Sequence, residues 1–241
     1  MHDLPRVQKF EFDDPAEGQV LEFRLTYKGP LPADQGTGNK AKYKHLIRKH
    51  FHKQLRELWK QHPSLRLQAE SSWQKLLRND DGSWQVRKVN VLLGSPFSPD
   101  DSIKGWIEHI ADDHQSCNTK WVPLVSKVSG FSCSLEILFM RRDGPGGLVA
   151  HGGDIDNRIK TLLDGLRKPD TVSDLGGLPI DPDENPFHCL LQDDRLITGI
   201  TVTTDRLLVP LEAQEKDSWV ELVIGVKITN PNALFENNRL V

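Results

Sequence analysis

The chain has 241 residues, of which 37% are hydrophobic and 27% are charged, and its formal net charge is −3 at pH 7. This composition is typical of a globular domain, and no run of 18 apolar residues is present to form a membrane span. The N-terminal residues lack the basic and then apolar pattern of a signal peptide, and three cysteines are an odd number for a disulfide framework, so we expect a cytoplasmic protein.

The first elements expected along the chain are a strand and a basic helix. Residues 20–27 alternate apolar and polar side chains, as a half-buried strand does. Residues 40–60 carry eight Lys and Arg against one acid, Glu57, and should form a helix that ends before Pro63. Its apolar stripe consists of Ile47, Phe51, Leu55 and Leu58. Five cations share another face of this helix: Lys42, Lys49, Lys53, Arg56 and Lys60.

The remaining elements predict the fold class. Residues 64–120 are interpreted as an insertion that contains a strand at 84–93 and a helix at 101–110. Further strands are expected at 131–141, 196–204 and 219–229. This order of elements predicts an α+β domain with a mixed or antiparallel sheet flanked by helices.

The segment "GGDIDNRIKTLLDGLRKPD", residues 152–170, combines a helix with closely spaced acids. An apolar stripe at helical spacing should pack on the sheet: Ile159, Leu162, Leu163 and Leu166. Asp156, Lys160 and Asp164 are spaced four residues apart on a separate polar face, and Asp154 lies just before them. Taken alone, Asp156 or its neighbour caps the helix, Lys160 and Asp164 form a surface ion pair, and Asp154 is a loop acid.

A second pair of acids changes the weight of this interpretation. Asp193 and Asp194 come directly before an expected strand. If that strand lies beside the helix, three carboxylates converge, and their repulsion is best offset by a hard cation. Mg²⁺ takes oxygen ligands and is commonly held by carboxylates together with substrate phosphates. Lys160, one turn beyond Asp156, is placed to supply positive charge to a transition state.

These residues resemble the signature of the RusA family of Holliday junction resolvases. The matching positions are Asp154, Asp156, Asn157, Lys160, Asp164, Gly165, Leu166, Asp193 and Asp194. The resemblance implies a homodimeric endonuclease that cleaves four-way DNA junctions in recombination and repair, with Mg²⁺ as cofactor, Mn²⁺ as a substitute and no small-molecule cofactor. It implies metal binding and catalysis by Asp154, Asp156 and Asp194, a catalytic Lys160, and supporting roles for Asn157, Asp164 and Asp193.

The resemblance covers about residues 131–200, with weaker agreement over 20–60. We therefore expect a single RusA-like domain over residues 1–241, with an insertion at 64–120 and a long loop at 165–192. Neither segment is typical of the family. The long loop is a candidate to cover the site, to extend the DNA surface, or to add ligands such as Asp181 and Asp183.

Cations provide the expected DNA contacts. Besides the five on the basic helix, several lie near the acidic motif in sequence: Arg141, Arg142, Arg158, Arg167 and Lys168. A solvated charged face is the alternative for the basic helix.

Two alternative functions also stay open: a non-catalytic DNA-binding or scaffold relative, and a nuclease that acts on flaps or forks. A calcium loop is disfavoured because Ile159 stands where the sharp turn needs Gly, and no zinc or phosphate-loop spacing is present.

Overall fold

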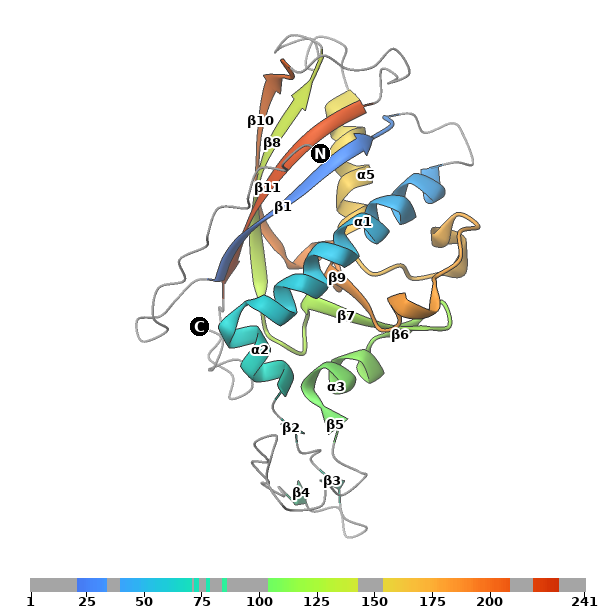
Figure 1. Ribbon diagram of the computed structural model, residues 1–241, viewed down its shortest axis with the longest axis vertical. Coiled ribbons are helices and arrows are strands. Elements are labelled where there is room, and N and C mark those ends of the chain that lie inside the picture. Colours follow the sequence, from blue (N-terminus) through green and yellow to red (C-terminus); the bar gives the residue numbers. More distant parts are fainter. Residues whose placement is uncertain are drawn as a thin grey trace, which may run out of the picture.

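A mixed four-stranded sheet forms the frame of the molecule (Figure 1). The computed structural model describes residues 21–33, 40–70, 72–73, 77–78, 84–85, 104–142, 154–208 and 219–229. The sheet has the order β1-β11-β8-β10, in which β10 runs parallel to β8 and the other neighbours are antiparallel. Its strands are β1 (Leu21–Pro30), β8 (Ser132–Arg141), β10 (Ile197–Arg206) and β11 (Trp219–Thr229).

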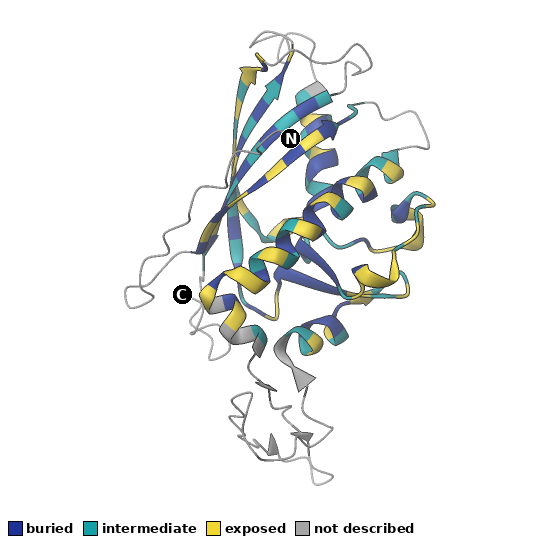
Figure 2. Cartoon of the chain, viewed as in Figure 1, coloured by how far each residue is buried: buried dark blue, intermediate teal, exposed yellow. Residues whose placement is uncertain are grey.

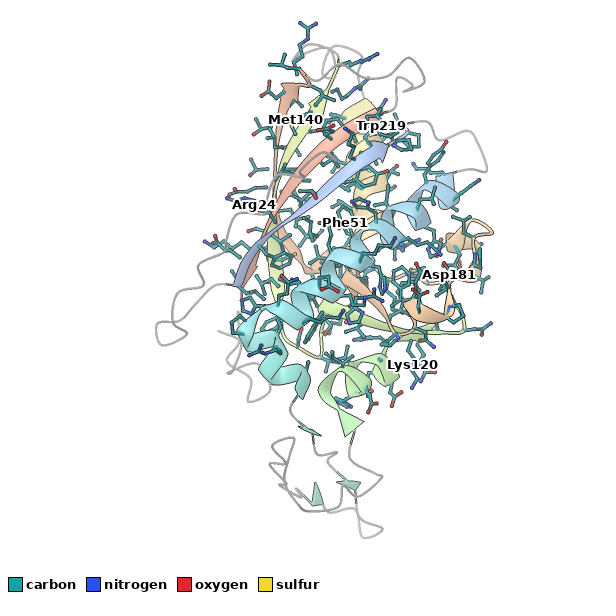
Figure 3. The ribbon with its side chains drawn as sticks, viewed as in Figure 1. Arg24, Phe51, Lys120, Met140, Asp181 and Trp219 are labelled. Atoms are coloured by element: carbon teal, nitrogen blue, oxygen red, sulfur yellow. The ribbon has the colours of Figure 1, made fainter. Side chains whose placement is uncertain are left out.

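Two helices cover one face of this sheet, namely α1 (Lys40–Gln61) and α5 (Asp154–Leu166) (Figure 1). Burial alternates strictly along β1, so one side of the strand faces the core and the other faces solvent (Figure 2). Phe51 of α1 is buried against the sheet, with its ring centroid 6.0 Å from that of Tyr27 on β1 (Figure 3). The predicted α+β fold with a mixed sheet is therefore confirmed.

A second sheet packs against α1, in segments where the sequence predicted only an insertion and a loop. It has the order β6-β7-β9, with β7 (Thr119–Val125) parallel to β9 (Phe187–Leu191) and antiparallel to the short β6 (Gln115–Ser116). Every residue of β9 is buried, so the segment 165–192 is not simply a surface loop. Strands buried on both faces lack the alternation that identified β1, which explains why β7 and β9 were missed.

Smaller elements complete the described chain. The helices α2 (Pro63–Glu70) and α3 (Trp106–Asp113) pack against each other, and α3 also contacts β7. Of the strand expected at 84–93, only β4 (Trp84–Gln85) is described, paired with β3 (Leu77–Arg78), and the rest lies outside the described residues. A two-stranded pair joins β2 (Ser72–Trp73) to β5 (Lys104–Gly105). Among the described helices, none is long and apolar enough to cross a membrane.

Buried histidines line the contact between α1 and β9. His45, His52 and His188 are each at most 6% exposed. The backbone N–H of His188 donates to Nδ1 of His52 at 2.8 Å, and the His52 ring packs 4.4 Å from the Phe187 ring. Burial lowers the pKa of His45 and His52 to about 4 and that of His188 to about 3. The neighbouring cations Arg48 and Arg56 act in the same direction, against a smaller opposite effect of Glu184 on His45 and His52.

This contact should make folding stability depend on pH. A histidine whose pKa is lowered in the folded state binds fewer protons there than in the unfolded chain, so its contribution is complete above about pH 6.5 and is lost as pH falls toward 4. We expect the free energy of unfolding, measured with urea, to fall by on the order of 2 kcal/mol from pH 7 to pH 5. His188→Leu should flatten this dependence, whereas His50→Gln, at an exposed position of α1, should not. Equal stability at both pH values would contradict the prediction.

Candidate active site

The face of α5 that carries the predicted catalytic residues is open at its N-terminal end. The helix begins at Asp154, so Asp156 lies in its first turn rather than at the cap, where a carboxylate still meets the positive end of the helix dipole. Asp156 and Lys160 are both exposed, and neither makes an ion pair or hydrogen bond with the described residues. Leu162 and Leu166 are buried in the core, as their spacing predicts. The side chain of Asp154 lies outside the described part.

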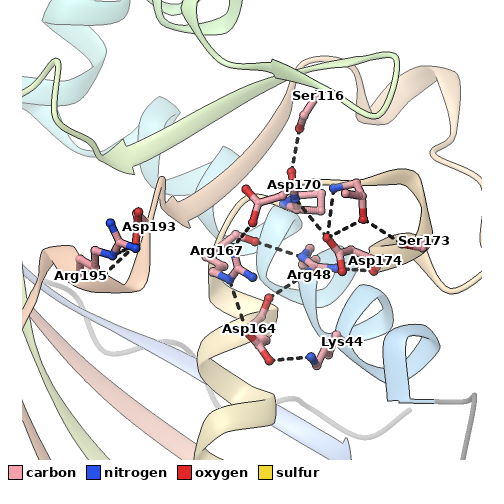
Figure 4. A network of polar contacts seen from close by, with 12 residues as sticks. Lys44, Arg48, Ser116, Asp164, Arg167, Asp170, Ser173, Asp174, Asp193 and Arg195 are labelled. Atoms are coloured by element: carbon pink, nitrogen blue, oxygen red, sulfur yellow. Dashed lines mark hydrogen bonds and ion pairs between the residues drawn. The ribbon is translucent and has the colours of Figure 1, made fainter.

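Asp164, at the other end of this polar face, is occupied by packing contacts. Its Oδ2 lies 2.6 Å from Nζ of Lys44 on α1, and its Oδ1 accepts from Nε of Arg167 at 3.3 Å (Figure 4). The Asp164 side chain is only 13% exposed. The polar face is thus divided: Asp156 and Lys160 are open to solvent, while Asp164 fixes α5 against α1. In this position Asp164 makes contacts that hold the fold together.

Arg48 completes the attachment of α1 to the end of α5. Its guanidinium is buried and donates to three backbone carbonyl oxygens, those of Asp164 at 2.8 Å, Asp174 at 2.9 Å and Arg167 at 3.0 Å (Figure 4). Asp174 belongs to the 3-10 helix η1 (Val172–Leu175). Burial lowers the pKa of Arg48 from its usual value. Sequence reasoning missed this residue, although its spacing from Phe51 and Leu55 places it on the buried side of α1.

The predicted acidic pair lies between β9 and β10, in the turn that leads to the 3-10 helix η3 (Asp194–Leu196). Asp193 caps η3, because its Oδ1 accepts from the backbone N–H of Arg195 at 3.0 Å (Figure 4). This hydrogen bond is the main cause that lowers the pKa of Asp193. Asp194 is exposed, so the two neighbouring acids have different roles: one holds the turn and the other is open to solvent.

The structure brings Asp194 next to α5, the helix that carries Asp156 and Lys160. Asp194 lines a shallow depression of about 410 Å³ together with Leu163 of α5. Leu163 lies about one turn beyond Lys160 and two turns beyond Asp156 along the helix, and neither of these two residues lines the depression. Among the described residues, no group of three or more His, Cys, Asp or Glu is arranged to hold a metal ion. The predicted set also needs Asp154, whose side chain lies outside them.

The residues present suit a hard divalent cation. All three predicted ligands are carboxylates, which supply the oxygen atoms that Mg²⁺ prefers. Asp156 is exposed without a polar partner among the described residues, and Asp194 is exposed on the neighbouring turn. Carboxylates needed for packing have partners, as Asp164 shows. The two exposed acids are therefore accessible to a ligand.

Several cations expected to contact DNA are engaged by the protein itself. Lys49 Nζ lies 2.8 Å from both Asp181 Oδ2 and Glu184 Oε2, which keeps the pKa of Lys49 raised. Arg56 donates to the carbonyl oxygen of Asp183 at 3.1 Å. These acceptors belong to the 3-10 helix η2 (Pro182–Glu184) and to its cap Asp181, which Figure 3 shows beside α1. The segment 181–184 therefore docks on α1, and its acids do not supply ligands to the α5 site.

The other predicted cations differ in how far they are buried or paired. Arg158 and Arg141 are each 7% exposed, and Arg158 Nη1 donates to the carbonyl oxygen of Leu31. The expectation that these two arginines contact phosphates is wrong, because buried guanidinium groups do not face a ligand in solvent. Arg167 is held by Asp164 and Asp170. Four of the predicted cations are exposed: Lys42, Lys53, Lys60 and Arg142, of which Lys60 pairs with Glu57 at 2.7 Å.

Comparison of the chain with models of protein families, with curated proteins and with solved structures matches none of them. The functional conclusion therefore rests on the residues and geometry of the site.

Proposed function

We propose that the chain is a Mg²⁺-dependent endonuclease that hydrolyses phosphodiester bonds in branched DNA, with four-way junctions as its first candidate substrate. The observation that supports the proposal is that the exposed Asp194 lines one depression with Leu163 of α5, the helix that also bears the exposed Asp156 and Lys160. The resemblance of the motif to RusA-like resolvases supports the same reaction and substrate class.

Each residue has a distinct role in this proposal. Asp154, Asp156 and Asp194 hold the cation, which when bound supplies an activated water and neutralises charge on phosphate oxygens. Lys160, one turn from Asp156, donates to the non-bridging phosphate oxygen on which negative charge develops. Asp193 fixes the turn that presents Asp194. Asp164 and Arg48 keep α5 in place against α1.

One experiment tests the proposal directly. The purified chain is incubated with a labelled four-way junction, a flap, a fork and a nicked duplex over a titration of Mg²⁺, and then of Mn²⁺. We expect metal-dependent paired cuts in the junction, together with a sedimentation mass of two chains, since two cuts related by a two-fold axis need two sites. Junction binding without cleavage in either metal would favour the non-catalytic alternative. Cleavage of flaps or forks alone would keep the chemistry and change the substrate.

Two lysines of α1 should separate DNA binding from folding. Lys53 is exposed and has no ion pair with the described residues, whereas Lys49 is held by two carboxylates. We expect Lys53→Ala to weaken junction binding and to reduce the slope of log affinity against log salt by about one. Lys49→Ala should change this slope less and lower the free energy of unfolding more. Fluorescence anisotropy at several salt concentrations measures the slope, and an unchanged slope for Lys53→Ala would remove this residue from the DNA surface.

A further inference from the structure

Most residues that line the depression beside Asp194 have no role in the proposed metal chemistry. Apart from Asp194, its lining consists of Leu163, Arg195, Ile197, Thr198, Gly199 and Ile200. The Arg195 side chain is 83% exposed, and Ile200 is one of the exposed large hydrophobic residues, at 43%. Asp193 Oδ1 lies 4.0 Å from Arg195 Nε, which is at the limit of an ion pair. A planar cation and an apolar surface therefore lie together on an open site.

The strand β10 has a β-bulge where it enters the depression, next to Asp194. Ile197 pairs with Cys133 and Gly199 with Ser134, so Thr198 is an extra residue that forms a β-bulge at the start of β10. Thr198 Oγ1 donates to the carbonyl oxygen of Cys133 at 3.1 Å, which fixes the bulge. Bulges at sheet edges commonly redirect side chains next to active sites. Here the bulge lies between η3, which carries Asp194 and Arg195, and the regular part of β10.

The depression also borders an open sheet edge. β10 is the last strand in the order β1-β11-β8-β10, so among the described strands it pairs only with β8. Its outer edge therefore offers backbone N–H and C=O groups as well as the side chains of the depression. A ligand seated there would meet an apolar surface, a guanidinium plane and peptide hydrogen-bonding groups.

This set of groups suits an unpaired nucleobase better than a phosphate. Asp193 and Asp194 directly precede Arg195 and would repel a phosphate that approached the depression without a cation. A base is uncharged, and single-stranded bases stack on aromatic side chains and receive cation–π contributions from Arg. Bases inside a duplex are stacked and paired, whereas those at a branch point can leave the stack. The depression thus offers a way to distinguish branched DNA from regular duplex.

We propose that the depression formed by Leu163, Arg195 and residues 197–200 receives the unpaired base next to the cleaved phosphate, with Arg195 and Ile200 as its contact surface. This inference rests on the proposed nuclease function and deepens it, because it assigns residues to the selection of branched DNA. Arg195 is in this view a substrate-positioning residue.

The test compares a junction that carries all its bases with one in which the nucleotide next to the cut is abasic. We expect the wild-type chain to cleave the abasic junction about tenfold more slowly, by the size of one lost base contact. Arg195→Ala and Ile200→Ala should each slow cleavage of the intact junction by about the same factor and be indifferent to loss of the base. Arg195→Lys keeps the positive charge but loses the guanidinium plane. Its rate on the intact junction, and its loss of rate on the abasic junction, should both lie between those of the wild type and of Arg195→Ala.

A matched control uses the same strand. Arg206→Ala removes an exposed arginine at the opposite end of β10 and should leave the abasic effect as in the wild type. Thermal unfolding of each variant verifies that it is folded. The inference is overturned, while the nuclease function stands, if the wild-type chain cleaves the intact and the abasic junction at equal rates. The same holds if Arg195→Ala and Ile200→Ala slow cleavage of the intact and the abasic junction by the same factor relative to the wild type. If the wild-type chain cleaves no branched DNA with Mg²⁺ or Mn²⁺, the proposed function fails first.

Discussion

Asp156→Asn should abolish most of the nuclease activity while leaving the protein folded and able to bind a junction. Asp156 is exposed in the first turn of α5 and makes no polar contact with the described residues, so its charge is not needed to hold the fold. Asparagine keeps the size of the side chain and removes the negative charge that a divalent cation requires. We expect cleavage to fall by about 100-fold or more, as it does when a group that stabilises the transition state is removed.

The control for this variant lies on the same helix face. Asp164→Asn changes an acid whose partners are Lys44 and Arg167, so it should lower the free energy of unfolding by about 1–3 kcal/mol while cleavage at a permissive temperature stays near that of the wild type. The measurements are single-turnover cleavage, junction affinity and urea unfolding for both variants. Wild-type cleavage by Asp156→Asn, or equal loss of cleavage by both variants, would contradict the separation of a role in activity for Asp156 from a role in stability for Asp164.

The strands and helices that were predicted correctly are those with one buried face. Alternation along β1 and β11 and the leucine stripe of α5 arise because each element has one side in the core and one in solvent. β9 is buried along its whole length and follows a stretch rich in Pro, Gly and Asp, so its short apolar run resembles part of a loop. Periodicity carries no information about an element that lacks an exposed side.

The sequence predicted only those features of the candidate site that depend on local spacing along the chain. Helical spacing put Asp156 and Lys160 on one face, and the position of Asp194 before a strand suggested its approach to α5, which the depression shared with Leu163 supports. The occupation of Asp164 by Lys44 was not predictable, because the two residues are far apart in sequence and only the packing of α1 on α5 joins them. For the same reason the contacts of Lys49 and Arg56 with segment 181–184 were not predictable, and both residues were expected to bind DNA.

Arg48→Met should cause one of the largest losses of stability of any single change in α1. Arg48 is 2% exposed and donates to carbonyl oxygens at the end of α5, after it and in η1, so its removal takes the donor from three partly buried acceptors. Each unsatisfied acceptor costs about 1–3 kcal/mol, partly offset by the apolar fit of methionine, and we expect the free energy of unfolding to fall by about 3 kcal/mol.

The matched control for this prediction is Lys53→Met, the same substitution at an exposed position of the same helix. It should change stability by less than about 0.5 kcal/mol, because surface substitutions away from buried networks usually do. Urea unfolding of both variants at pH 7 gives the comparison, and a loss below 0.5 kcal/mol for Arg48→Met would contradict the prediction. Because Arg48 fixes the C-terminal end of α5 while Asp156 lies at its N-terminal end, the folded fraction of Arg48→Met should cleave DNA at the wild-type rate. A basic helix that resembles a DNA surface in sequence would then be shown to act, through this residue, as the support that holds α5.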